Sequence, residues 1–255
     1  MLAGLVLTVA DTAYAIAAIR AEEGKRPARE RLFEDPYASI FLAAGEHARE
    51  GIDRFLGLPF FRDAIRLRTR FIDDFVREGL DRGVRDIVLL GAGFDARALR
   101  MREIAERQAT VYEVDFAEQL ANKRALLDAA GVARPSWLKD VACDFKDPEF
   151  GAALEAGLEA QGFRRDAGAL FVWEGVVAYL DDEAIDRTLR FVAQTGGKGS
   201  CIVFEGAPGR FAPIAMSRAG FSRCESTGLD ALWRRYLPGE PHENAALVHM
   251  YILSV

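Results

Sequence analysis

Two glycines that follow a short apolar run could bring the backbone close to a bound ligand. The run covers residues 87–90, and Gly91 and Gly93 come directly after it, before a segment that can start a helix. An apolar run without polar alternation is typical of a parallel strand that is covered on both faces. Because glycine lacks a Cβ atom, the backbone can turn sharply there and approach a ligand closely. The pattern predicts a nucleotide-cofactor loop.

A second predicted strand, residues 109–115, ends in acidic side chains that could bind the hydroxyl groups of a ribose. Asp115 and Glu113 are both candidates, since side chains two residues apart lie on the same face of a strand. A dinucleotide fingerprint would need a third glycine where this chain has Ala96, which is followed by the bulky Arg97. A cofactor without a pyrophosphate does not need that glycine. This favours S-adenosylmethionine over NAD or FAD.

Several further blocks occur in a fixed order along the chain. They are residues 68–74 (RTRFIDD), 90–97 (LGAGFDAR), 112–116 (YEVDF), 141–145 (VACDF) and 173–180 (WEGVVAYL), preceded by residues 11–22 and 35–37. Together they resemble the leucine carboxyl methyltransferase family, in particular its bacterial branch, over roughly residues 10–225. The resemblance implies an α/β fold with the Rossmann-like class I methyltransferase sheet, which has seven mostly parallel strands, a C-terminal antiparallel hairpin and an N-terminal helical cap. It also implies an S-adenosylmethionine-dependent O-methyltransferase.

The resemblance assigns roles to several residues whose roles their own chemistry does not decide. It favours Asp115 over Glu113 for the ribose. It assigns Asp144 and Phe145 to the adenine, with the carboxylate accepting from the exocyclic amine and the ring covering one face. From the residues alone, Asp144 could equally be a helix N-cap or a turn aspartate before residues 146–148.

Charged residues outside the glycine loop could hold the amino-acid end of the cofactor. Arg68 is a candidate for its carboxylate, because a guanidinium is always charged and can bind a carboxylate in a bidentate manner. Arg70 competes for this role, and Arg20 on the first predicted helix could add a second cation as part of a lid. Glu174 follows the apolar residues 169–173. A carboxylate at the mouth of a buried strand needs a partner, and the cofactor's ammonium group is a natural one.

The acceptor is expected to approach Tyr179, which would mainly position it and could instead only pack the loop. Methyl transfer from a sulfonium is an in-line displacement, so the protein mainly aligns the reacting groups. A carboxylate, with a reference pKa of about 4, is already ionised at pH 7, whereas a phenol, at about 10, needs a base such as histidine. His47, His242 and His249 are scattered between the predicted cap and the tail. The expected acceptor is therefore a carboxylate or an acidic hydroxyl of a small molecule or a peptide C-terminus.

Composition narrows the class of protein. The 255 residues carry a net charge of −6, which argues against a nucleic-acid groove, since such a groove needs a basic stripe. No apolar stretch reaches the length of about 18 residues that a membrane span needs. Three cysteines without a dense pattern fit a reducing cytoplasm, and no Cys or His spacing predicts a metal site.

Strand and helix signals alternate after residue 85, which predicts a parallel sheet with right-handed crossovers. We expect one domain over residues 1–255, with a helical cap or lid over 1–80 and a Rossmann-like core over 81–255. The first helix is predicted at 8–22. Strands are predicted near 86–91, 110–115, 136–140, 168–173 and 200–205 and in the tail at 220–226 and 245–253, with helices near 95–107, 117–130, 147–161 and 182–195.

Two other functions compete with methyl transfer. A nicotinamide-dependent dehydrogenase could use the same glycine loop, but Ala96 and the absence of a Tyr-x-x-x-Lys pair disfavour it. A catalytically inactive S-adenosylmethionine-binding partner subunit would keep the same binding residues. The presence of Gly91, Gly93, Asp115 and Glu174 argues for cofactor binding in either case.

Overall fold

A seven-stranded mixed sheet forms the centre of the molecule. The computed structural model describes residues 9–45, 49–165 and 167–255. Its strands are β1 (Asp86–Leu90), β2 (Thr110–Asp115), β3 (Leu138–Ala142), β4 (Ala169–Trp173), β5 (Cys201–Gly206), β6 (Arg223–Gly228) and β7 (His249–Ser254). They lie in the order β3-β2-β1-β4-β5-β7-β6. β1 to β5 are parallel, and β7 runs antiparallel to β5 and β6. The sheet agrees with the Rossmann-like class I methyltransferase sheet that the family resemblance implies.

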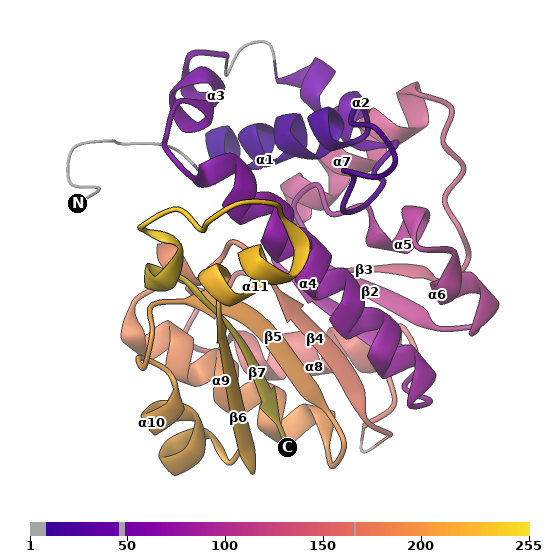
Figure 1. Cartoon of the computed structure of the whole chain (residues 1–255). Coiled ribbons are helices and arrows are strands. Elements are labelled where there is room, and N and C mark those ends of the chain that lie inside the picture. Colours follow the sequence, from indigo (N-terminus) through magenta and orange to yellow (C-terminus); the bar gives the residue numbers. More distant parts are fainter. Residues whose placement is uncertain (1–8, 46–48, 166) are drawn as a thin grey trace.

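Helices cover both faces of the sheet, which explains why β1 and β4 are buried along their whole length. One face packs against α4 (Phe61–Asp81), α5 (Arg97–Arg100), α6 (Arg102–Glu106) and α11 (Leu229–Tyr236). The other face packs against α8 (Phe150–Ala160) and α9 (Asp182–Gly196). In Figure 1, α4 and α11 lie in front of the sheet and α8 lies behind it.

Three helices near the N-terminus form a cap over the carboxyl ends of the parallel strands. They are α1 (Val9–Glu23), α2 (Ala38–Ala44) and α3 (Arg49–Leu56), which are grouped together in Figure 1. Phe94, in the loop after β1, lies with its ring 4.7 Å from that of Phe41 and 5.1 Å from that of Tyr14. The cap therefore packs directly on the glycine loop.

The strand order reverses beside β1, because β2 lies on one side of it and β4 on the other. In open α/β sheets, ligands bind at this switch point, outside the carboxyl ends of the strands. The loop that contains Gly91 and Gly93 leaves β1 here. The topology thus places the predicted cofactor loop at the expected position of a ligand.

Some elements differ from the sequence prediction. The single helix predicted over 95–107 is two short helices, because the backbone is extended at Met101, with φ −89° and ψ 98°. β3 begins at Leu138, not near 136. The two tail strands pair antiparallel as the resemblance implies, but α11 lies between them in the chain, so no short turn joins them. Residues after β5, for which the sequence predicted no element, form α10 (Ala212–Ile214) and a π-helical turn (Ala215–Ala219).

The part of the chain that the structure describes contains no helix that is long and apolar enough to span a bilayer.

Candidate cofactor site

The loop after β1 turns at two glycines with left-handed backbone angles. Their φ values are 73° at Gly91 and 44° at Gly93. A Cβ atom on Gly91 would stand 2.3 Å from Cγ2 of Val176, so glycine here lets the loop after β1 pack against the loop after β4. A Cβ atom on Gly93 would meet nothing closer than the carbonyl oxygen of Gly91 at 4.0 Å. The space beside Gly93 can therefore receive a ligand.

Asp115 lies against this loop at the end of β2. Its Oδ2 accepts a hydrogen bond from the N–H of Gly93 at 2.7 Å, and its Oδ1 accepts one from the N–H of Phe116 at 2.8 Å. Burial raises the pKa of the Asp115 carboxyl, and the two N–H groups counteract this in part. A carboxylate has about four lone-pair sites, so this fixed carboxylate keeps capacity for the hydroxyl groups of a ribose.

Glu113, the other acidic candidate on β2, belongs to a buried ion pair. Its side chain is 3% exposed, and Nζ of Lys123 lies 2.7 Å from its Oε1. Lys123, on α7 (Ala117–Ala129), also donates to the carbonyl oxygen of Asp95. Burial raises the pKa of Glu113, and Lys123 opposes the shift. The structure thus gives Glu113 a partner that holds α7 to the sheet.

Glu174, directly after β4, lies at the centre of three arginines. Its Oε1 accepts from Nη2 of Arg20 at 2.8 Å and from Nε of Arg68 at 3.0 Å, and its Oε2 accepts from Nη1 of Arg97 at 2.7 Å. Burial favours the neutral acid, but the three guanidinium groups hold the pKa of Glu174 well below its usual range. The arginines come from α1, α4 and α5. The cluster therefore joins the cap to the end of the sheet.

A buried network keeps Arg97 in place. Its side chain is 1% exposed, and its Nε donates to Oδ1 of Asp73 at 2.8 Å. Asp73 also accepts two hydrogen bonds from Arg100, both at 2.7 Å. In the sequence, Arg97 stood out only as the bulky residue after Ala96. Its contact with Glu174 is seen only in the structure.

The arginine cluster keeps free donors for an additional anion. Nε of Arg20, Nη2 of Arg68 and Nη2 of Arg97 are buried and have no hydrogen-bond partner among the described residues. A buried donor without a partner costs about 1–3 kcal/mol. A carboxylate that entered the cluster would satisfy these donors, and the amino-acid end of S-adenosylmethionine carries one. The residues present therefore fit the cofactor.

Other predicted site residues have different surroundings. Arg70 donates to Asp74 at 2.9 Å and to the carbonyl oxygen of Leu32 at 3.2 Å, and so lies outside the Glu174 cluster. Tyr179 is tied to the cap, since its hydroxyl lies 2.6 Å from Oγ1 of Thr12. His47 lies outside the described residues.

At the predicted adenine position, Asp144 is exposed and its Oδ1 accepts from the N–H of Lys146 at 2.9 Å, as in the turn that the sequence left open. Phe145 is 6% exposed, and its ring packs edge-on against Phe150. The contact of both residues with adenine stays a prediction. Phe116, next to Asp115, was not predicted as a site residue and is 49% exposed, so its ring is available to a base.

Glu205, at the end of β5, was also missed. Its Oε1 accepts from Nη1 of Arg68 at 3.0 Å and from the N–H of Gly175 at 2.7 Å. The sequence signal was present, since Glu205 follows an apolar run just as Glu174 does. Nothing in the sequence showed that the two strands are neighbours.

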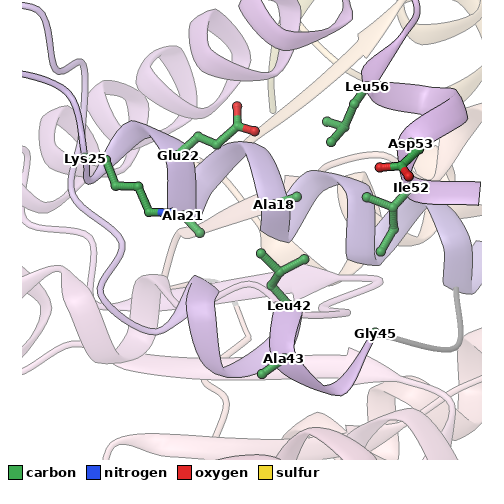
Figure 2. A pocket seen from close by; sticks show the side chains of 10 residues that line it. All are labelled: Ala18, Ala21, Glu22, Lys25, Leu42, Ala43, Gly45, Ile52, Asp53 and Leu56. Atoms are coloured by element: carbon green, nitrogen blue, oxygen red, sulfur yellow. The ribbon is translucent and has the colours of Figure 1, made fainter. Parts of the chain in front are cut away.

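A hollow of about 330 Å³ lies between α1, α2 and α3 (Figure 2). Small apolar side chains such as Ala18 and Ala43 line it, together with the polar Glu22, Lys25 and Asp53. It shares no lining residue with the arginine cluster or the glycine loop. The hollow is therefore a separate feature of the cap.

Comparisons with known proteins agree with this geometry. The family model for leucine carboxyl methyltransferase matches residues 13–193. A relative from Mycolicibacterium vanbaalenii is 32% identical over 80% of this chain and 69% of its own length, and one from Frankia alni is 36% identical over 76% and 67%. Both bear the name of an S-adenosylmethionine-dependent methyltransferase.

A solved structure from Thermobifida fusca, named as a methyltransferase, shares the fold. Its TM-score is 0.56 at 15% sequence identity, over 97% of this chain and 94% of that one. The chain belongs to the leucine carboxyl methyltransferase family and is an S-adenosylmethionine-dependent methyltransferase.

Proposed function

We propose that this enzyme transfers the methyl group of S-adenosylmethionine to an oxygen atom of a small molecule or a peptide C-terminus, either a carboxylate or an acidic hydroxyl. The observation that carries the proposal is the group of buried arginines with free donors around Glu174, next to the open space at Gly93. The family description, which names a carboxyl acceptor, supports oxygen as the nucleophile.

In this proposal each part of the site holds one part of the cofactor. Asp115 binds the ribose, the loop at Gly93 accommodates the methionyl chain, and Arg68 with Arg20 binds its carboxylate. Glu174 binds the ammonium group. S-adenosylmethionine supplies a methyl group on a sulfonium, and the protein aligns the acceptor oxygen with it. Tyr179 is proposed to position the acceptor.

Methyl transfer can be tested with isotope-labelled S-adenosylmethionine and two sets of acceptors, small carboxylic acids and small phenols. Products that mild alkali hydrolyses are methyl esters, whereas methyl ethers survive. Thermal denaturation with S-adenosylhomocysteine or NAD tests the cofactor class, since a ligand at 100 times its Kd adds about 2.7 kcal/mol of stability. Stabilisation by NAD alone would favour the dehydrogenase, and stabilisation by S-adenosylhomocysteine without any transfer would favour an inactive binding subunit. A cytoplasmic location stays a prediction.

Gly93→Ala is expected to lower the affinity for S-adenosylhomocysteine at least tenfold, because a methyl group would project into the space proposed for the cofactor. The φ of 44° also strains any L-residue, by about 1–2 kcal/mol. Gly83→Ala is a matched control, since Gly83 has a φ of 96° and open space around its Cβ position but precedes β1, whereas the loop follows this strand. Calorimetry on both folded variants separates strain from occlusion. Equal affinities would exclude the loop assignment.

Asp115→Ala is expected to weaken the binding of S-adenosylhomocysteine by about 1.5–3 kcal/mol, the range for a hydrogen bond to a charged group. Glu113→Gln should act on stability instead, because it leaves Lys123 buried without its anion, at a cost of about 3–5 kcal/mol. Calorimetry and urea denaturation measure the two effects. The opposite assignment of effects would move the ribose contact to Glu113.

A further inference from the structure

Glu205 and Glu174 lie side by side at the carboxyl edge of the sheet. Trp173 pairs with Phe204 in the parallel register of β4 and β5, so the residues that follow them are level with each other. Both glutamates contact Arg68 on α4 and therefore point to the same face of the sheet. Apart from Arg68, the two carboxylates have different hydrogen-bond partners.

Glu174 has both oxygens occupied by arginines, whereas Glu205 has one oxygen that is free. Oε1 of Glu205 is held by Arg68 and by the N–H of Gly175. Its Oε2 is buried and accepts no hydrogen bond from any residue that the structure describes. Leaving a buried acceptor unsatisfied costs about 1–3 kcal/mol. With Oε1 held in place, Oε2 remains an unsatisfied acceptor that a hydrogen-bond donor of a ligand would satisfy.

The order of the strands indicates which ligand supplies this donor. Asp115 ends β2, the glycine loop follows β1, Glu174 follows β4 and Glu205 is the residue before the last in β5. Neighbouring strands lie about 4.8 Å apart. If the ribose lies over β2 and the methionyl group over β1 and β4, as in the proposed function, Glu205 lies one strand beyond the cofactor. This is the side from which an acceptor can approach.

The chemistry of the free oxygen distinguishes between the two acceptor classes. A carboxylate acceptor has no proton to donate and would place a second negative charge beside Glu205. A hydroxyl acceptor donates to Oε2 and needs a base, because a phenol with a reference pKa of about 10 is neutral at pH 7.

We propose that Glu205 is the general base of this methyltransferase and that its acceptor is a hydroxyl compound, a refinement that rests on the proposed function. Oε2 accepts the hydroxyl proton while the acceptor oxygen forms its bond to the methyl carbon. The bond from that carbon to sulfur breaks, and its electron pair neutralises the sulfonium. The products are a methyl ether, S-adenosylhomocysteine and protonated Glu205.

The groups around Glu205 make its carboxylate more basic. Burial raises its pKa, Arg68 on α4 lowers it, and Glu174 on β4 raises it again, with a net upward shift. Arg20 on α1 and Arg97 on α5 face Glu174, beyond this pair. Brønsted behaviour makes a base more effective as its pKa approaches the working pH.

The test is Glu205→Gln, which keeps the shape and the carbonyl contacts with Gly175 and Arg68 but cannot take a proton. With phenols as acceptors, kcat should fall about 10²- to 10⁴-fold, the usual contribution of a general base. The acid limb of the wild-type pH–rate profile should disappear. The affinity for S-adenosylhomocysteine should stay within about threefold, while phenol binding to that complex should weaken at least tenfold.

His249 provides a matched control. It pairs with Gly206 across β5 and β7, but its Nδ1 lies 2.6 Å from Oγ of Ser226, and alternation along the strands points it to the face opposite Glu205. His249→Asn should keep the acid limb. Loss of the limb in this variant alone would make His249 the base.

Three further results would contradict the assignment of Glu205. These are unchanged phenol turnover in Glu205→Gln, loss of S-adenosylhomocysteine affinity in parallel with the rate, and a wild-type complex that binds no phenol or methylates only carboxylic acids. The last result would leave the proposed function intact. Failure of the wild type to bind S-adenosylhomocysteine would instead contradict the proposed function itself.

Discussion

Arg68→Ala is expected to lower the affinity for S-adenosylhomocysteine by about 2–5 kcal/mol, because it leaves the ligand carboxylate without its partner in a desolvated site. The fold places Arg68 well inside the molecule, at 8% exposure, with Glu174 and Glu205 as partners. A loss of stability is therefore also expected. The decisive measurement is the ratio of affinities for S-adenosylhomocysteine and a decarboxylated analogue, determined by calorimetry for each folded protein.

Wild type should distinguish the two ligands strongly, and Arg68→Ala should barely distinguish them. Arg68→Lys should recover only part of the difference, since lysine keeps the charge but loses the planar fork. Arg70→Ala is the control on the same helix, because Arg70 contacts Asp74 and lies 5.0 Å from the ring of Tyr236. If wild type and Arg68→Ala discriminated equally, Arg68 would be excluded from the carboxylate site.

Glu174→Gln is expected to lower the free energy of unfolding at pH 7 by about 3–5 kcal/mol, since three buried arginines lose their shared anion. The effect should depend on pH. The folded-state pKa of Glu174 is lowered, so its contribution is present above the unfolded value of about 4.3 and is lost as the pH falls through the folded-state pKa. Urea denaturation of both proteins between pH 7 and pH 3 should show their difference shrinking in acid.

Glu103→Gln is a suitable control for a carboxylate in a more exposed pair. Glu103 lies 2.8 Å from Arg77, with the two side chains 31% and 37% exposed. Solvent screening limits such a pair to about 0.2–1 kcal/mol. Similar losses of stability in the two variants would mean that the Glu174 cluster is no stronger than a surface ion pair.

Local sequence patterns predicted the parallel strands and the glycine loop well. A strand buried on both faces appears as a run of consecutive apolar residues, and a sharp turn appears as closely spaced glycines. The reason for Gly91 was not local, since the atom that a side chain would hit belongs to Val176 in another loop. Similarly, the acidic residues of β2 share a face, and only the position of Lys123 on α7 shows which of them is already paired.

The sequence offered candidate residues for the site but not the contacts between them. We expected Arg68, Arg20 and Glu174 each to hold the cofactor. The structure shows that both arginines also donate hydrogen bonds to Glu174. Glu205 went unnoticed because its position beside Glu174 depends on the register between β4 and β5, which no single segment specifies. The tail was poorly predicted for a similar reason, as its short helices pack on elements far away in the sequence.

The contacts that complete the arginine cluster span most of the chain. Arg20 and Glu174 are 154 residues apart, and Arg68 and Glu205 are 137 residues apart. Contacts of large sequence separation have a high loop-closure cost and slow the folding of the chains that depend on them. During synthesis, the glycine loop emerges long before β5 does, so Arg20 and Arg68 are made well before their partners Glu174 and Glu205. The arginine cluster can therefore be completed only after β4 and β5 have been synthesised and have paired with each other.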